Sequence, residues 1–221
     1  MKAMLLAAGR GTRLAPLTDT TPKPMLPVAG KPLIHWQLEK LQAGGVTDCV
    51  INLHHLGHQI RDYVGDGQRF GLNVHYSEEP ELLDTGGGIV NALSLLGTAP
   101  FWIFNGDVWT DFDFNDLPKA PPNDCPAHIV VTPTPDWRER GDFDYADGYI
   151  KRRGTHHVYC CIAVIDPTVF AGAPDGAFSL RDIYFDLINQ GRLSAQLHIG
   201  TWHDIGTFAQ YQALQAEQTN A

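Results

Sequence analysis

The first half of the chain alternates short apolar runs with segments of helical periodicity, and this alternation limits the fold more than any other feature. The apolar runs predict strands, and the periodic segments predict helices. Because most of these runs are continuously apolar over several residues, they suit a largely parallel sheet whose two faces are both covered by helices. We therefore predict a doubly wound α/β fold, with strands over 2–7, 49–53, 73–77 and 101–105 and helices over 33–43, 58–64 and 88–96.

The second half of the chain is less regular. Residues 118–123 form a proline-rich connection, and residues 133–148 are polar and rich in turn formers. No repeat or convincing linker is present, so we expect one domain over residues 1–221. Further strands are expected over 127–132, 159–165 and 193–198, and further helices over 180–190 and 207–217.

Composition excludes several classes of function. The 221 residues are 43% hydrophobic, enough for one sizeable core, and the formal net charge of -9 argues against a nucleic-acid partner. The first apolar run is too short for a signal peptide, and none approaches the ~20 apolar residues of a membrane span, so we expect a cytoplasmic protein without a membrane partner. Four cysteines without CxxC spacing predict buried thiols: Cys49, Cys125, Cys160 and Cys161.

Positive charge is concentrated near the N-terminus. Between Gly9 and Lys31 there are four Lys or Arg residues and one acid, Asp19. The first expected strand leads into Gly9-Arg10-Gly11-Thr12-Arg13, where backbone N–H groups and arginines can surround phosphate. An ordinary glycine turn is the alternative, but the arginines and the following Pro22-Lys23-Pro24 favour binding of a compact anion.

Two carboxylates follow expected strands. Asp107 comes directly after the strand over 101–105, and Asp204 follows the strand over 193–198. Taken alone, either residue would be interpreted as a turn former or a helix cap. Ligands of open α/β sheets bind beyond the carboxyl ends of the strands, and Mg²⁺ prefers one or two carboxylates together with substrate phosphates. Together with the basic loop, the pair predicts a site for Mg²⁺ and a triphosphate.

These motifs resemble those of the sugar-1-phosphate nucleotidylyltransferases. The loop over 9–13 followed by Pro22-Lys23-Pro24 is similar to the signature of that family, and Asn105-Gly106-Asp107 and residues 202–207 resemble its two metal-binding segments. The resemblance covers nearly the whole chain. It implies a Rossmann-like, mixed or mostly parallel sheet of the nucleotide-diphospho-sugar transferase type, and a Mg²⁺-dependent transfer of a nucleotidyl group from a nucleoside triphosphate to a sugar 1-phosphate.

The resemblance also implies a division of the chain and a role for each site residue. Residues 1–117 would form the nucleotide-binding core, 118–200 mainly the sugar-phosphate side, and 201–221 the second metal segment and a closing helix. Arg13 and Lys23 would be catalytic, and Asp107 and Asp204 would bind the metal. The expected nucleotide-binding residues are Ala8, Gly9, Gly11, Thr12, Arg13, Glu79, Gly86 and Gly87, and the expected sugar-phosphate ligands are Lys23, Asn105, Gly141 and Asp142.

The choice of base depends on Glu79. In the family, the corresponding residue approaches the base, and a carboxylate there accepts from the N3–H of uracil or thymine but repels the N3 acceptor of cytosine. We therefore expect UTP to be favoured, with dTTP or another triphosphate left open. The alternative is that Glu79 is a solvated carboxylate before a proline turn.

The acceptor sugar is where the sequence departs from the family pattern. Residues 78–88, 105–111 and 141–143 are most similar to the branch that uses N-acetylmuramate 1-phosphate in peptidoglycan recycling. However, residues 149–154 lack the Glu-Lys-Pro segment common in relatives, and Cys160-Cys161 stands where Ser-Gly is usual. The basic run 151–153 could balance an acidic sugar, or it is simply solvated.

Other readings stay open. The chain could be a non-catalytic nucleotide-sugar-binding regulatory protein, or it could use glucose 1-phosphate, mannose 1-phosphate or phosphocholine. Phosphocholine would require an aromatic cage, to which Trp109, Trp137 and Tyr145 could contribute. Residues 54–58 lack the partners of a zinc site, and Asp111-Phe112-Asp113 resembles a glycosyltransferase motif without its context. The resemblance implies a monomer or weak dimer.

Overall fold

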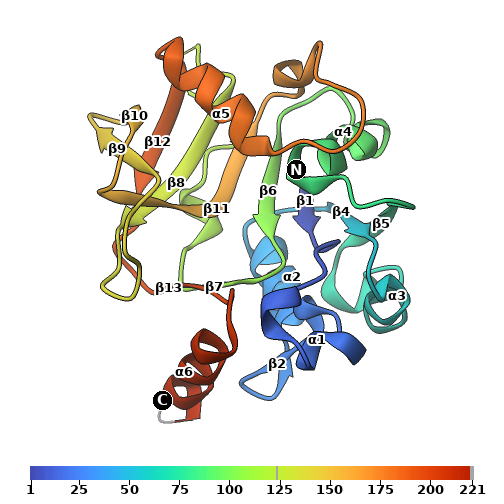
Figure 1. The fold of residues 1–221 in the computed structure, drawn as a ribbon. Helices are drawn as coiled ribbons and strands as arrows, with labels where there is room; N and C mark the ends of the chain where they lie inside the picture. Colours follow the sequence, from blue (N-terminus) through green and yellow to red (C-terminus); the bar gives the residue numbers. More distant parts are fainter. Residues whose placement is uncertain (123, 220–221) are drawn as a thin grey trace.

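A mixed sheet of nine strands runs through the computed structural model, which describes residues 1–122 and 124–219 (Figure 1). Its strand order is β5-β4-β1-β6-β11-β8-β12-β10-β9. Asn123, at the end of the expected proline-rich connection, and residues 220–221 of the expected last segment lie outside the described residues. None of the helices in the described part of the chain is both long and apolar enough to cross a bilayer.

The N-terminal half follows the predicted alternation. Four neighbouring strands are parallel, namely β5 (Asn73–Glu78), β4 (Asp48–Leu53), β1 (Lys2–Leu6) and β6 (Phe101–Asn105). Their connections contain α2 (Leu33–Ala43), α3 (Gly57–Val64) and α4 (Asp84–Leu96). α4 begins earlier than the predicted Gly88, because Gly86 and Gly87 allow the 176–178 segment to pack directly against its first turn.

The second half makes the sheet mixed. β11 (His157–Ile165) is antiparallel to both β6 and β8 (Ala127–Pro133), and β12 (Leu193–Leu197) is parallel to β8. α5 (Leu180–Asn189) precedes β12, and the chain closes with α6 (Phe208–Thr219). The predicted elements are present with shifts of a few residues at their ends.

Helices cover both faces of the sheet, which confirms the doubly wound α/β architecture. Ala3 and Leu5 of β1 face a core with α2 and α3, whereas Met4 faces a second core with α4 and α5. This division follows from the strand geometry, since successive side chains point to opposite faces. Cys49, Cys125 and Cys160 are buried free thiols, as predicted, and Cys161 is half-buried.

A hairpin replaces part of the expected turn-rich stretch. β9 (Phe143–Ala146) pairs with β10 (Tyr149–Arg153) through a turn at Asp147 and Gly148, whose φ angles are 52° and 81°. Asp-Gly is a favoured dipeptide for such a turn because both residues adopt positive φ at low cost. The polar stretch over 133–148, expected to be rich in turns, therefore ends in a strand and the turn of a hairpin.

A short ribbon joins the two halves of the chain below the main sheet. β7 (Val108–Thr110) and β13 (Trp202–Asp204) are antiparallel, with Asp204 opposite Val108 (Figure 1). α6 follows β13 and packs through Tyr211 and Leu214 against the N-terminal segment around Leu26. The ribbon thus fixes the C-terminal segment next to the end of β6.

Candidate active site

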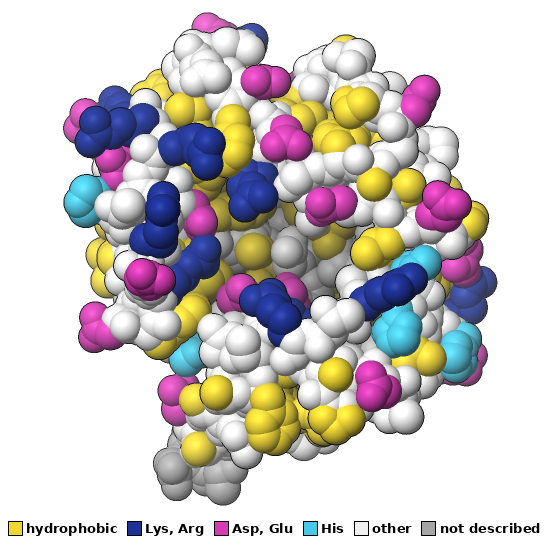
Figure 2. All heavy atoms as spheres, in the orientation of Figure 1, with side chains coloured by type: hydrophobic (Ala, Val, Ile, Leu, Met, Phe, Trp, Pro, Cys, Tyr) yellow, Lys and Arg dark blue, Asp and Glu magenta, His cyan; other side chains and the backbone are white. Residues whose placement is uncertain are grey.

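A hollow on one face of the molecule lies beyond the carboxyl ends of β1 and β6. Figure 2 shows this hollow with acidic side chains in its floor and basic side chains around it. It consists of two adjoining cavities of about 300 and 350 Å³. Both are lined by Leu6, Asp84, Thr85 and Asn105, so these residues mark their common border.

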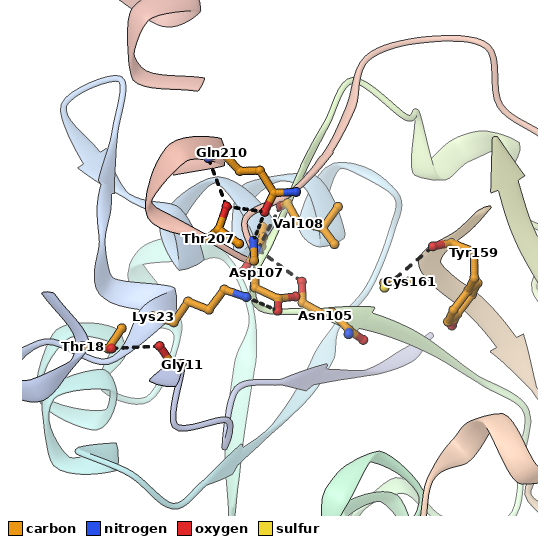
Figure 3. A network of polar contacts seen from close by, with 12 residues as sticks. Gly11, Thr18, Lys23, Asn105, Asp107, Val108, Tyr159, Cys161, Thr207 and Gln210 are labelled. Atoms are coloured by element: carbon orange, nitrogen blue, oxygen red, sulfur yellow. Dashed lines mark hydrogen bonds and ion pairs between the residues drawn. The ribbon is translucent and has the colours of Figure 1, made fainter. Parts of the chain in front are cut away.

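The expected nucleotide loop borders the first cavity. Ala8 and Gly9 line it together with Asn52, Glu79, Leu82 and Asp107. Gly11 has a φ of 64°, and a Cβ there would lie 2.9 Å from Cγ2 of Thr18, whose hydroxyl donates to the Gly11 carbonyl at 2.9 Å (Figure 3). The backbone turn therefore requires glycine on both conformational and steric grounds. Thr12 and Arg13 are exposed beyond it, and neither residue lines either cavity.

Lys23 reaches the floor of the hollow from a tight turn (Lys23–Met25) that begins between two prolines. Its side chain is only 9% exposed, and its Nζ lies 2.5 Å from Oδ2 of Asp107 (Figure 3). The prolines restrict the backbone on either side of the lysine. The ammonium group is thereby held beside Asp107 at the end of β6. Asp107 lines the first cavity, whereas Lys23 itself lines neither.

The ribbon of β7 and β13 brings Asp107 and Asp204 together. The amide of Ile205 donates to the Asp107 carbonyl at 3.1 Å. Burial raises the pKa of Asp204 above its ordinary value, and the nearby charge of Asp107 raises it further, while Lys23 and Arg13 oppose the shift. Arg13 lies over this turn, since a Cβ on Gly206 would be 3.1 Å from its Nη1. The four predicted charged residues therefore share one site.

This carboxylate pair fits a divalent cation. Oδ1 of Asp107 is buried and has no hydrogen-bond partner within the described part of the chain. A buried anionic oxygen without a partner is costly, and a cation would satisfy it. No cluster of three or more His, Cys, Asp or Glu side chains suited to a metal occurs among the described residues. Two carboxylates with the remaining positions left to phosphates and water is the arrangement that Mg²⁺ prefers.

Glu79 is buried rather than solvated, so the alternative reading of this residue is wrong. Its side chain lines the first cavity, where Oε1 accepts from Asn52 at 2.6 Å and Oε2 accepts from the Leu83 amide at 3.1 Å. Asn52 in turn accepts from the Ala7 amide at 2.7 Å. These bonds fix the carboxylate in one orientation beside the nucleotide loop.

Gly86 and Gly87 lie outside the lining of both cavities. The space that a Cβ would take is filled by the Phe178 ring at Gly86 and by the Gly176 carbonyl at Gly87, at 2.3 and 2.2 Å. Close packing of the chain therefore accounts for these glycines. A contact between them and the base stays a prediction.

On the acceptor side, the expected residues differ in how they face the hollow. Asn105 lines both cavities, and Asp142 lines the second. Asp142 accepts from Arg138 at 2.9 Å and from the Tyr159 amide at 3.1 Å, so both of its oxygens are engaged within the protein. Gly141 lines a neighbouring outer hollow instead, and the space for a Cβ there is filled by Thr134 and the His157 carbonyl.

Several residues of the second cavity were not anticipated. Arg138, Arg181, Tyr159, Tyr184 and Cys161 all line it. The tyrosine hydroxyls are 3.1 Å apart, and burial raises the pKa of both well above the ordinary value, so they are neutral. Arg138 lies in the polar stretch over 133–148, and Arg181 lies in the first turn of α5. The periodicity of apolar residues gives no indication that either arginine lines a cavity.

Cys161 has an unusual backbone conformation. Its φ is 61°, and it lies where the register of β11 against β8 shifts between Tyr159 and Ala163. Glycine adopts this left-handed conformation at low cost, which fits the Ser-Gly that is usual at 160–161 in the family that the sequence resembles.

The histidines of the 54–58 segment support the backbone. Nδ1 of His54 contacts the Glu79 carbonyl at 2.8 Å, and Nε2 of His55 contacts the Thr18 carbonyl at 2.9 Å. Each histidine thus ties the end of β4 to a segment that borders the nucleotide side. Residues 54–56 connect β4 to α3, and Gly57 and His58 belong to the first turn of α3.

Comparison with known proteins identifies the family of this chain. A model of the nucleotidyl transferase family matches residues 2–154, and the chain belongs to that family. It is 43% identical to N-acetylmuramate alpha-1-phosphate uridylyltransferase of Neisseria meningitidis over 98% of this chain and 97% of that protein. It is 32% identical to the enzyme of the same name from Caulobacter vibrioides, over 92% and 91% of the two chains.

Solved structures show the same fold at lower identity. A Bacillus anthracis protein crystallised with sucrose superposes with a TM-score of 0.86 and 23% identity, over 100% of this chain and 96% of that one. A UDP-glucose pyrophosphorylase in complex with UDP-glucose gives a TM-score of 0.81 and 19% identity, over 100% and 99%. These two likenesses concern the fold alone.

Proposed function

We propose that this protein transfers a uridylyl group from UTP to N-acetylmuramate 1-phosphate, producing UDP-N-acetylmuramate and pyrophosphate. The observation that carries the proposal is the pair of buried Lys23 and half-buried Asp107 near Asp204, with Asp107 lining the first cavity and Asp204 lining the second. The two relatives named above, each similar over nearly its full length, support this choice of nucleotide and acceptor. The proposal places the reaction in peptidoglycan recycling in the cytoplasm, where UTP is available.

The reaction is an in-line displacement at phosphorus. An oxygen of the sugar 1-phosphate attacks the α-phosphorus of UTP, a new P–O bond forms, and the bond to the bridging oxygen of the β-phosphate breaks. That oxygen leaves with the electron pair as part of pyrophosphate. Phosphoryl-type transfers depend mostly on positioning and on neutralising charge, so the cavity needs fixed cations more than it needs a general base.

The chain provides two such cations. Lys23 lies beside Asp107, which lines the first cavity, and near Asp204, which lines the second, so its ammonium group would contact both the α-phosphate and the incoming phosphate. Arg13, above Gly206, would hold the departing β- and γ-phosphates. Asp107 and Asp204 would hold Mg²⁺, which when bound neutralises phosphate charge and orients the oxygens.

The hydrogen bonding of Glu79 favours a nucleotide whose base carries an N3–H group. Each of its carboxylate oxygens has two lone pairs, and each accepts one hydrogen bond from the protein. Lone pairs remain for the N3–H of uracil or thymine, whereas the N3 of cytosine would face an anion. This chemistry favours UTP or dTTP over CTP, and the relatives favour UTP.

Two alternatives are less well supported. A regulatory binding protein would not need the charged site that this chain retains around Lys23. A cage for phosphocholine would need aromatic rings around one point, but Trp137 stacks on Trp202, Trp109 packs on Trp36 and Tyr145 packs on His157. Other family members are named for glucose 1-phosphate and mannose 1-phosphate, which remain the main competing acceptors.

The test is a panel of pyrophosphate-release assays that crosses UTP, dTTP, CTP and GTP with 1-phosphates of N-acetylmuramate, glucose, mannose and N-acetylglucosamine. We expect the highest kcat/KM for UTP with N-acetylmuramate 1-phosphate, and dTTP as the second nucleotide. A higher value for glucose or mannose 1-phosphate would overturn the proposed acceptor. Binding of nucleotide without release for any pair would favour the regulatory reading.

A further inference from the structure

We propose that Arg181, supported by Arg138, binds a second negative group of the acceptor and selects sugar phosphates that carry a carboxylate. This inference rests on the proposed function, and it names the residues that bind the acidic substituent of the sugar. In N-acetylmuramate that group is the carboxylate of the lactyl ether.

The position of the two arginines follows from how the cavities adjoin. The second cavity, which we call the acceptor cavity, borders the first, which we call the nucleotide cavity. The border consists of Asn105 and the three other residues that line both cavities. The acceptor cavity borders the outer hollow through Arg138, Asp142 and Arg181, which line both. An acceptor whose phosphate lies at the nucleotide border therefore points its far end toward the arginines.

Most side chains between these borders are uncharged, among them Phe143, Tyr159, Tyr184 and Trp202, and both tyrosines keep their protons. The carboxylates of the cavity are Asp84 at the nucleotide border, Asp142, which pairs with Arg138, and Asp204, which we assign to the metal. Under the proposed function, Lys23 and Arg13 serve the phosphates beside Asp107 and Asp204. Two arginines at the opposite border, in a chain of net charge -9, therefore indicate a ligand with a second anionic group.

Arg181 is the better candidate of the two. Arg138 donates to Asp142 at 2.9 Å, so much of its charge is neutralised within the protein. Arg181 has no carboxylate within 4.0 Å among the described residues. It is exposed in the first turn of α5 and free to present its planar guanidinium to a carboxylate through two parallel hydrogen bonds.

The basic run of the sequence is engaged elsewhere. Arg152 pairs with Asp144 at 2.7 Å, and Lys151 pairs with Asp147 at 3.7 Å. Arg153 lies over the Phe185 ring, with its guanidinium carbon 4.2 Å from the ring centroid, and it lines the outer hollow. None of these three residues lines the acceptor cavity itself. The sequence-based candidate for balancing an acidic sugar is therefore replaced by Arg181.

The test compares two acceptors that differ only by the lactyl ether, N-acetylmuramate 1-phosphate and N-acetylglucosamine 1-phosphate. For Arg181→Gln we expect kcat/KM for N-acetylmuramate 1-phosphate to fall about 10- to 100-fold, the range for loss of a charged hydrogen-bonded contact. The competitive inhibition constant of N-acetylglucosamine 1-phosphate should stay within about threefold. Arg181→Lys should recover part of the loss because it retains the charge.

Arg192→Gln is the matched control, because it removes an exposed arginine just beyond the other end of α5, where its guanidinium donates to the Asp124 carbonyl. It should leave both constants unchanged. An equal effect of Arg181→Gln on both acceptors, or no effect on either, would overturn the inference while leaving the proposed function intact. Absence of turnover of N-acetylmuramate 1-phosphate by the unmodified protein would instead overturn the proposed function.

Discussion

Replacing Lys23 by alanine is expected to lower kcat by a factor on the order of 10² to 10³ while the protein remains folded. The side chain holds a buried ammonium group beside Asp107 at the end of β6. Its charge is fixed in place by Asp107 and the flanking prolines, so water cannot replace it at the moment of reaction. The measurement is steady-state pyrophosphate release, together with thermal unfolding followed by circular dichroism.

Two further variants separate charge from packing. Lys23→Met keeps the length of the side chain and should lose activity as fully as Lys23→Ala. Lys119→Ala removes an exposed lysine and should behave as the unmodified protein. Turnover by Lys23→Met close to that of the unmodified protein would contradict the role assigned to the ammonium group.

The second large effect is expected at the carboxylates. Asp107→Asn should lower turnover by a factor on the order of 10² or more, because the amide cannot replace the anionic oxygen that is buried without a partner. Asp204→Asn should act in the same direction. For the remaining activity, both variants should need more Mg²⁺ for half-maximal turnover, which a magnesium titration measures.

The matched control for these variants is Asp116→Asn, which makes the same change at an exposed carboxylate. Its magnesium requirement should equal that of the unmodified protein. Full turnover in excess EDTA would refute the proposed metal site. So would an Asp107→Asn variant with an unaltered magnesium dependence.

The parts of the fold that could be predicted are the buried elements, because burial requires a run of apolar residues that is visible in the sequence. Strands β1, β4 and β6 are buried on both faces, so their central residues are almost all apolar. The ribbon of β7 and β13 has three residues per strand, too few for any period to emerge. The hairpin of β9 and β10 is partly exposed and polar, and its Asp147-Gly148 turn was the one available signal.

The residues of the site also differ in whether the sequence alone could identify them. Lys23, Asp107 and Asp204 could be found because they follow strand ends or lie between prolines. Glu79 was ambiguous, since its burial depends on Asn52, a partner from another strand. Arg181 could not be found, because its significance depends on a cavity formed by segments far apart in the sequence.

The most direct test of the account identifies the products formed from UTP, Mg²⁺ and N-acetylmuramate 1-phosphate, by mass spectrometry and by phosphorus NMR. We predict UDP-N-acetylmuramate and pyrophosphate in equal amounts, and no more than about one hundredth of either product with Lys23→Ala over the same time within the linear range. Release of UMP and pyrophosphate by hydrolysis, or formation of no nucleotide sugar by the unmodified protein, would contradict the account.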